Sequence, residues 1–180
     1  MDYFEATIRR LLEEEGYWTK QSFKVELTKE EKRLIGKPSV PRPEIDLIAY
    51  KPSQNELLAI EVKSLLDSGG VKLFDLQQDY NVPKGKYKLF TCSNYRKIVF
   101  NRLSNQLFHE GQILSDVRIR LGLAAGNVHK NLESEMRLFS KFNDFFFWGP
   151  SDIREKVKEL AKKGYENDPT VMAAKILVRN

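Results

Sequence analysis

Apolar and polar residues along the chain follow two periods, a helical one and a period of two, and the changes between them mark the predicted elements. The first 16 residues place apolar side chains at one-turn spacing, the pattern of an amphipathic helix that ends at Gly16. Phe23, Val25 and Leu27 then alternate with charged residues, which predicts a strand. Residues 28–43 hold three prolines and many charges, and they predict a long connection.

The rest of the chain continues this alternation. Residues 44–51 and 56–65 predict two strands joined by the turn-forming tetrad PSQN, as in a hairpin. The same reasoning predicts, in order, a helix over 71–80, a short buried strand over 87–93, a helix over 94–111, strands over 117–126 and 144–149, a helix from Ser151 to Gly164 and a last helix capped by Asp168. We therefore expect a single α/β domain over residues 1–180, with a core in about 1–110 and a C-terminal strand and helix elaboration in about 111–180.

The predicted hairpin brings acidic residues together. If it is symmetric about Ser53 and Gln54, Asp46 lies directly opposite Glu61. Opposed residues of an antiparallel pair have Cβ atoms about 4.5–5.5 Å apart and share a face. Lys63 projects from the same face, and Glu44 would pair with it. Two carboxylates held so close repel unless a cation or a proton lies between them.

Two carboxylates and a lysine on neighbouring strands suit metal-assisted phosphodiester cleavage. Oxygen ligands bind a hard cation such as Mg²⁺, which keeps several waters and lowers the pKa of one of them. The lysine could orient or help deprotonate that water, or hold the phosphate. A plain surface hairpin with salt-bridged acids and lysine explains the same spacing without any function, so both interpretations stay open.

Composition narrows the class of protein. The chain is 41% hydrophobic and 31% charged, enough for a real core, and it has no apolar run of the roughly 18 residues that a membrane helix needs. Its start is acidic and amphipathic, unlike a signal peptide, so a cytoplasmic location without membrane partners is expected. The single Cys92 excludes an internal disulfide and a cysteine-based zinc site, and His109 and His129 have no metal-like spacing.

The net charge of +5 is distributed unevenly. Residues 1–70 carry 11 basic and 13 acidic side chains, whereas residues 71–150 carry 12 and 7. The basic surplus includes Lys84, Lys86, Lys88, Arg96, Lys97 and Arg102. Such a segment suits a phosphate backbone, although a solvated lysine-rich surface is the simpler alternative.

The hairpin resembles the PD-(D/E)xK nuclease superfamily. "PEIDLIAY" matches the motif aspartate at Asp46, and "LLAIEVKS" matches (D/E)xK at Glu61-Val62-Lys63, with Pro43 three residues before the aspartate instead of adjoining it. The stretch is most similar to Holliday-junction resolvases and Mrr-type nucleases. The resemblance implies a restriction-endonuclease-like core, in which helices flank a mixed central sheet in the order αβββαβ.

The resemblance also implies a function and a site. The protein would be a DNA nuclease that uses Mg²⁺ or Mn²⁺, with Asp46, Glu61 and the Val62 carbonyl as metal ligands and Lys63 serving the water or the phosphate. A glutamate on the first helix often completes the metal shell in this family. Glu5 is the candidate, and Glu13 is the alternative.

Further candidate DNA contacts follow the hairpin. "QQDY" resembles the Gln-x-x-Tyr of RecB-type nucleases, and on a helix Gln77 and Tyr80 would share one face. Asn94, Arg96 and Lys97 follow Ser93 at a predicted helix start, where backbone N–H groups can hold phosphate, although simple capping also accounts for the pattern.

Two other classes of function remain possible at this stage. The first is a nucleic-acid-binding module that has the fold but performs no chemistry, and the second is a scaffold subunit whose hairpin acids are only salt-bridged. Many relatives of this superfamily act as dimers, so a homodimer is possible, but no pattern identifies a dimer surface.

Overall fold

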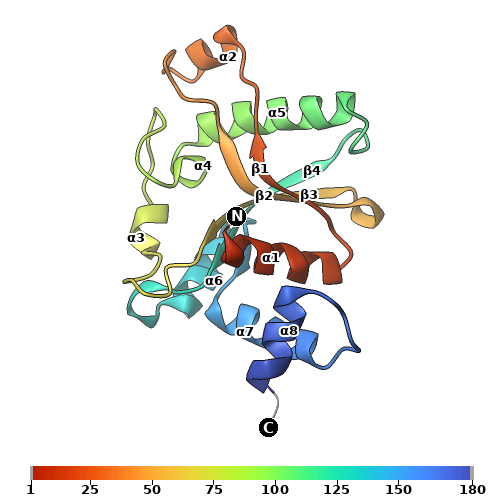
Figure 1. The fold of residues 1–180 in the computed structure, drawn as a ribbon. Coiled ribbons are helices and arrows are strands. Elements are labelled where there is room, and N and C mark those ends of the chain that lie inside the picture. Colours follow the sequence, from red (N-terminus) through yellow and green to blue (C-terminus); the bar gives the residue numbers. More distant parts are fainter. Residues whose placement is uncertain (1, 179–180) are drawn as a thin grey trace.

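A five-stranded mixed sheet forms the centre of the computed structural model, which describes residues 2–178 (Figure 1). The strands lie side by side in chain order: β1 (Trp18–Lys24), β2 (Glu44–Lys51), β3 (Glu56–Lys63), β4 (Arg118–Ala125) and β5 (Phe146–Trp148). The β1–β2 and β2–β3 pairs are antiparallel, whereas the β3–β4 and β4–β5 pairs are parallel. The α/β class and the mixed sheet are therefore as predicted.

Helices cover both faces of this sheet. They are α1 (Tyr3–Glu14), α2 (Lys29–Leu34), α3 (Leu73–Leu76), α4 (Lys88–Thr91), α5 (Ser93–His109), α6 (Glu133–Phe142), α7 (Pro150–Ala161) and α8 (Pro169–Val178). Figure 1 shows α1 and α5 on opposite sides of the strands. Among the helices of residues 2–178, none is both long and apolar enough to cross a bilayer.

The α1 face of the sheet contains one apolar core. Ile8 and Leu12 of α1 are fully buried in one cluster with side chains of β2 and β3, among them Leu58 and Ile60 of β3. Burial of these side chains is favourable by roughly 1.5–3 kcal/mol each, and this fixes α1 to the strands that carry the candidate acids.

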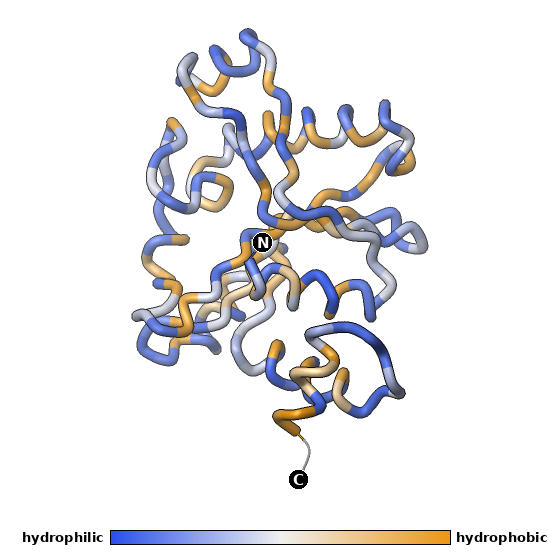
Figure 2. Tube along the Cα trace, in the orientation of Figure 1, coloured by the Kyte–Doolittle hydropathy of each residue, from blue (hydrophilic) through white to orange (hydrophobic). Residues whose placement is uncertain are grey.

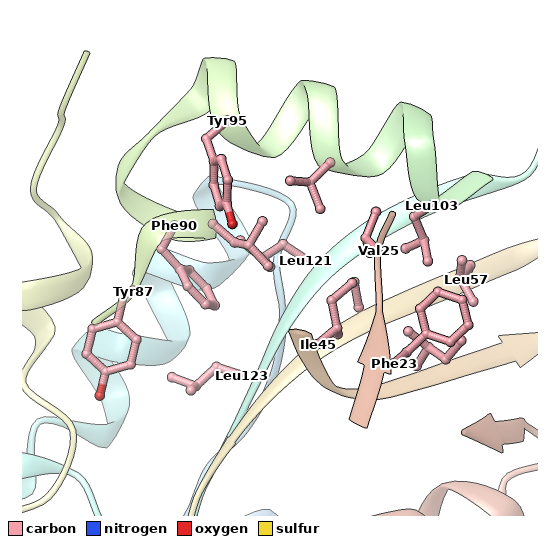
Figure 3. Packing of buried hydrophobic residues seen from close by; sticks show 14 of the residues in the cluster. Phe23, Val25, Ile45, Leu57, Tyr87, Phe90, Tyr95, Leu103, Leu121 and Leu123 are labelled. Atoms are coloured by element: carbon pink, nitrogen blue, oxygen red, sulfur yellow. The ribbon is translucent and has the colours of Figure 1, made fainter. Parts of the chain in front are cut away.

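The opposite face packs against α5. Val99 and Leu103 of α5 are fully buried, and they lie in one cluster with Leu57 and Leu121 of the sheet (Figure 3). Figure 2 shows the corresponding pattern along α5, hydrophilic on its outer side and hydrophobic toward the sheet. The apolar face predicted from the helical spacing of residues 94–111 is thus the face of α5 that packs on the sheet.

The β2–β3 hairpin has the predicted register. Its pairs run from Leu47 opposite Ile60 to Lys51 opposite Glu56. The turn contains a short 3₁₀ helix (η1, Pro52–Gln54) and then Asn55, whose left-handed backbone (φ 46°) asparagine tolerates better than most residues. The symmetric turn therefore sets the positions of the residues at the far end of the hairpin.

Strand β1 changes faces within its length. Thr19 donates a hydrogen bond to Glu13 of α1, whereas Phe23 packs in the cluster on the α5 side. Residues an even number apart share a face in a regular strand, so the backbone must turn between these two. Ser22 provides the turn, because its φ of 51° lies in the left-handed region.

The predicted strand over 87–93 is wrong. This segment forms the four-residue helix α4, and the strand that follows α5 is β4, which lies outside the predicted core of about 1–110. Leu89, Phe90 and Cys92 are buried, so the segment is apolar as expected. A short apolar run of this kind has no periodicity that separates a strand from a buried helical turn.

Two other segments differ from prediction. The helix expected over 71–80 is only the single turn α3, because Gln77 already caps its end and the Tyr80 N–H donates to the Thr91 carbonyl. The connection over 28–43 contains α2, where Thr28 and Glu31 form a capping box. The last helix begins as predicted, since the Asp168 carboxylate accepts the Val171 N–H.

The α1-facing core gives a test of this packing. Leu58→Ala should lower the free energy of unfolding by about 2–5 kcal/mol, because Leu58 is fully buried and its removal leaves a cavity. Urea denaturation followed by circular dichroism measures the change. Leu138→Ala is the matched control, since Leu138 is 68% exposed on α6, and it should change stability by no more than about 0.5 kcal/mol. Equal effects of the two substitutions would contradict the packing.

Candidate active site

The candidate site lies where β2 and β3 diverge. The β2–β3 pairing ends at Leu47 and Ile60, one residue before Asp46 and Glu61. Ile45 packs on the α5 side and Leu47 on the α1 side, so β2 turns at Asp46. The flanking pairs of the β1–β2 ladder place Asp46 opposite Ser22, where β1 turns as well. Both strands therefore change faces at the candidate acid.

The turn leaves the Asp46 carboxylate free to bind groups of β3. Its Oδ2 atom accepts the Val62 N–H at 2.8 Å and lies 2.8 Å from the Lys63 Nζ atom. The same Nζ atom is 3.3 Å from Oε1 of Glu61. The Lys63 ammonium thus bridges the two carboxylates. It occupies the position between them where a cation is needed to offset their mutual repulsion.

One predicted pair is wrong. Glu44 does not contact Lys63 but lies 3.9 Å from the Lys24 Nζ atom across the β1–β2 ladder. The side chains of Asp46, Glu61 and Lys63 remain between 16% and 29% exposed, so a ligand from solvent can reach all three.

Burial and mutual charge shift the acid–base equilibria of the cluster. Burial raises the pKa of Glu61 above its ordinary value; the Asp46 charge adds to this, while Lys63 opposes it. For Lys63 burial acts downward, but the two carboxylates outweigh it and the pKa is raised. Lys63 is therefore a firmly protonated ammonium in this arrangement, as its bridging contacts require.

Glu5 lies close enough to the cluster to be affected by it. Burial raises the pKa of Glu5, repulsion by Asp46 raises it further, and attraction to Lys63 lowers it. The Gln21 side chain of β1 also lowers the pKa of Glu5. Glu13, the alternative, is bonded to Thr19 two helical turns away. Of the two first-helix glutamates, only Glu5 is associated with the cluster.

The backbone of Val62 also faces the site. The Gly126 N–H donates to the Lys63 carbonyl, so the backbone N–H and C=O groups of Lys63 point toward β4. Successive strand residues direct their N–H and C=O groups to opposite sides, so the Val62 carbonyl points with its N–H toward β2 and Asp46. Its side chain is buried in the α1-facing core, which holds the backbone in place.

The donor set fits a hard divalent cation. Carboxylate and carbonyl oxygens are the ligands that Mg²⁺ and Mn²⁺ prefer, and Asp46, Glu61 and the Val62 carbonyl supply them. The Lys63 ammonium already occupies a cationic position between the carboxylates. Within residues 2–178, no three His, Cys, Asp or Glu side chains group closely enough to form a metal site by themselves, so part of the coordination shell would be water.

The predicted DNA contacts are only partly available. Gln77 is exposed but shares no helical face with Tyr80, whose ring lies 4.0 Å from the Lys84 Nζ atom. The Asn94 side chain donates to the Leu34 carbonyl at 3.0 Å. Lys97 is exposed on α5 and remains accessible.

Arg96, a predicted DNA contact, has structural contacts within the fold. Its guanidinium donates to the Leu89 and Phe90 carbonyls at the end of α4 and lies over the Phe145 ring. Burial lowers the pKa of Arg96, as expected for a cation held inside the fold. Through its Nη1 atom Arg96 ties α4 and α5 together.

Two residues near Glu61 were not identified from the sequence. Tyr95 points from α5 toward the sheet (Figure 3), and burial followed by the Glu61 charge raises the pKa of Tyr95 to about 12. Lys88 lies near enough to lower the pKa of Glu61. The charge of the basic segment could have identified Lys88 from the sequence. For Tyr95 the sequence offered only its place on the inner face of a predicted helix.

Comparisons with known proteins add little to this picture. No family model matches the chain, and no curated protein matches it. A crystal structure of a protein of unknown function, AF1548, is similar at 14% identity over 96% of this chain and 79% of that chain, with a TM-score of 0.40. A likeness this distant assigns neither a fold family nor a function.

The bridging lysine gives a direct test of the cluster. Asp46→Asn should lower the pKa of Lys63, because it removes one of the charges that raise it. A ¹³C NMR titration of the Lys63 Cε resonance measures the shift. Asp116→Asn is the control, since Asp116 is exposed with φ 56°, a backbone that asparagine tolerates. An unchanged Lys63 titration in Asp46→Asn would show that the cluster is not formed in solution.

Proposed function

We propose that this protein is a metal-dependent DNA nuclease of the PD-(D/E)xK type. The observation that carries the proposal is the convergence of Asp46, Glu61 and Lys63 on one partly exposed cluster, with the Lys63 ammonium 2.8 Å from one carboxylate and 3.3 Å from the other. These are the three positions at which the sequence resembles the family motif. Their convergence is what that chemistry requires.

The order of elements supports the same proposal. A helix, three antiparallel strands, a helix and a further strand are present as α1, β1, β2, β3, α5 and β4. If the short helices α2, α3 and α4 are set aside and β4 takes the place of the strand expected over 87–93, this order agrees with the αβββαβ order that the resemblance implies. The two motif strands also lie at the centre of the sheet, next to α1 and its Glu5.

Each residue has a distinct part in the proposed reaction. Asp46, Glu61 and the Val62 carbonyl would hold Mg²⁺ or Mn²⁺, and Glu5 would accept a hydrogen bond from a water of its shell. The bound ion supplies a more acidic water and positive charge for the phosphate. Lys63, protonated beside the carboxylates, orients the attacking water or binds a phosphate oxygen.

Substitution of the three motif residues tests the function. Asp46→Asn, Glu61→Gln and Lys63→Ala should each reduce Mg²⁺-dependent cleavage by two or more orders of magnitude, of the size seen when a group that stabilises transition-state charge is lost. Asparagine at position 46 keeps an acceptor for the Val62 N–H, so the fold should persist. Nicking of supercoiled plasmid is the measurement, with circular dichroism as the check on folding.

The same exposed control, Asp116→Asn, should retain wild-type cleavage. Wild-type activity in any one of the three motif variants would refute the assignment. Wild-type protein that cuts none of plasmid, linear, single-stranded or branched DNA with Mg²⁺ or Mn²⁺ would refute it as well.

Metal binding separates the nuclease from a scaffold subunit. A purely structural ion-pair cluster would contain the same contacts of Lys63 with Asp46 and Glu61. These contacts are the observation that favours the scaffold alternative. Isothermal titration calorimetry with Mn²⁺ should show one binding event in the wild type and none in the Asp46→Asn, Glu61→Gln double variant. If the wild type binds no divalent metal, the scaffold interpretation holds.

A further inference from the structure

A hollow of about 150 Å³ opens beside Glu61, one of the proposed metal ligands. It is lined by residues 41–44, which lead into β2, by Lys86 and Lys88 around the start of α4, and by Tyr95 of α5 (Figure 3). Lys88 also lies near enough to Glu61 to lower the pKa of that acid. The hollow therefore places two lysines next to the candidate active site.

These two lysines are the cations of the hollow that have no acidic partner. Arg42 and Glu44, which also line it, each form an ion pair with a residue outside the hollow. Within residues 2–178, neither Lys86 nor Lys88 belongs to an ion pair, and the Glu61 carboxylate is paired with the motif lysine instead. Positive charge that no carboxylate of the chain neutralises attracts a phosphate.

The other members of the basic stretch are engaged elsewhere or lie away from the hollow. The Lys84 Nζ atom lies over an aromatic ring, 4.0 Å from its centre, and Arg102 is paired with Glu31. Arg96 is bonded to backbone carbonyls of α4, and Lys97 is exposed on α5 but does not line the hollow. Of this stretch, the two lysines of the hollow are therefore the ones with charge available beside the site.

Lys88 is held more firmly than its neighbour. The Arg96 guanidinium donates to the Leu89 and Phe90 carbonyls at 2.7 and 3.2 Å, and both of these apolar side chains are buried. The turn that carries Lys88 is thus fixed to α5. Lys88 itself is half-buried, whereas Lys86 is exposed. A charge held in place before the substrate arrives needs little reorganisation during a reaction, and this favours Lys88 over Lys86 for a role in the chemical step.

The proposed reaction needs more positive charge than the motif residues provide. When Asp46, Glu61 and Glu5 are ionised, the cluster carries three negative charges and the single positive charge of Lys63. These charges cancel when a divalent ion is bound. The phosphodiester is itself an anion, and attack by water increases the negative charge on its oxygens in the transition state. A further cation beside the metal would stabilise that charge.

We propose that Lys88 binds a non-bridging oxygen of the phosphate being cut and stabilises the negative charge that develops there, while Lys86 acts in substrate binding alone. In the reaction a bond forms between the water oxygen and phosphorus, and the bond from phosphorus to the leaving oxygen breaks. One hydrogen of the water ends on the leaving oxygen and the other stays with the new phosphate end, so Lys88 keeps its proton throughout. The proposal rests on the nuclease function above, and it leaves Lys63 to orient the water.

Replacing each lysine by methionine tests the proposal, because methionine keeps most of the side-chain stem and lacks the charge. Nicking of supercoiled plasmid with Mg²⁺ is followed over a range of plasmid concentrations. Lys88→Met should lower kcat by about 100-fold, the loss found when one group that stabilises transition-state charge is removed, with a smaller change in KM. Lys86→Met should raise KM and leave kcat close to that of the wild type.

Two controls separate the charge of Lys88 from folding. Lys88→Arg keeps the charge and should retain more of the wild-type kcat than Lys88→Met does. Lys158→Met removes one positive charge from an exposed position of α7 and should leave kcat and KM unchanged. Circular dichroism checks that every variant is folded. A kcat of Lys88→Met equal to that of the wild type would overturn the proposal, and so would an arginine variant no more active than the methionine variant.

Metal binding distinguishes a role at the phosphate from support of the metal ligand. In isothermal titration calorimetry, Lys88→Met should bind Mn²⁺ at least as tightly as the wild type, because the variant removes a positive charge from the neighbourhood of Glu61. Loss of Mn²⁺ binding in this variant would show that Lys88 supports the metal site, and it would overturn the phosphate role.

Failure of this proposal is distinct from failure of the proposed function. If the wild type cuts plasmid and Asp46→Asn does not, full activity of Lys88→Met would overturn only the role of Lys88. A wild type that cuts no DNA would overturn the nuclease function and this role together.

Discussion

The arrangement depends on one cation placed between two carboxylates. Asp46 and Glu61 are largely buried, and without positive charge between them their repulsion and loss of hydration would separate the ends of β2 and β3 or protonate one acid. Lys63 supplies that charge from within the chain. The contact lies where β2 and β3 diverge and where β2 changes faces at Asp46. A divalent ion and a charged side chain would therefore share one electrostatic role here.

The parts that could be predicted from the sequence are those set by local chemistry. The hairpin register follows from a short symmetric turn, and a period of two then determines which residues oppose each other. The inner faces of α1 and α5 follow from helical spacing, because each helix has one apolar side to bury. These rules were sufficient to bring Asp46, Glu61 and Lys63 together, since all three lie within one hairpin.

The parts that could not be predicted depend on contacts between distant segments. The turn at α4 is held by Arg96 from the next helix, and no pattern within residues 87–93 reports such a partner. Tyr80 leaves the helical path because its N–H bonds to Thr91. The hollow beside Glu61 is formed by two segments more than 40 residues apart in sequence. In each case the deciding partner lies on another element.

The left-handed residue Ser22 couples the edge of the sheet to its chemistry. A regular backbone at this position would keep Thr19 and Phe23 on one face, and through the cross-strand pairs it would force Ile45 and Leu47 onto one face as well. Asp46 would then no longer stand at a crossover between the two layers and would be committed to one of them. The left-handed backbone at Ser22 therefore accompanies the position of Asp46 between the α1 side and the α5 side of the sheet.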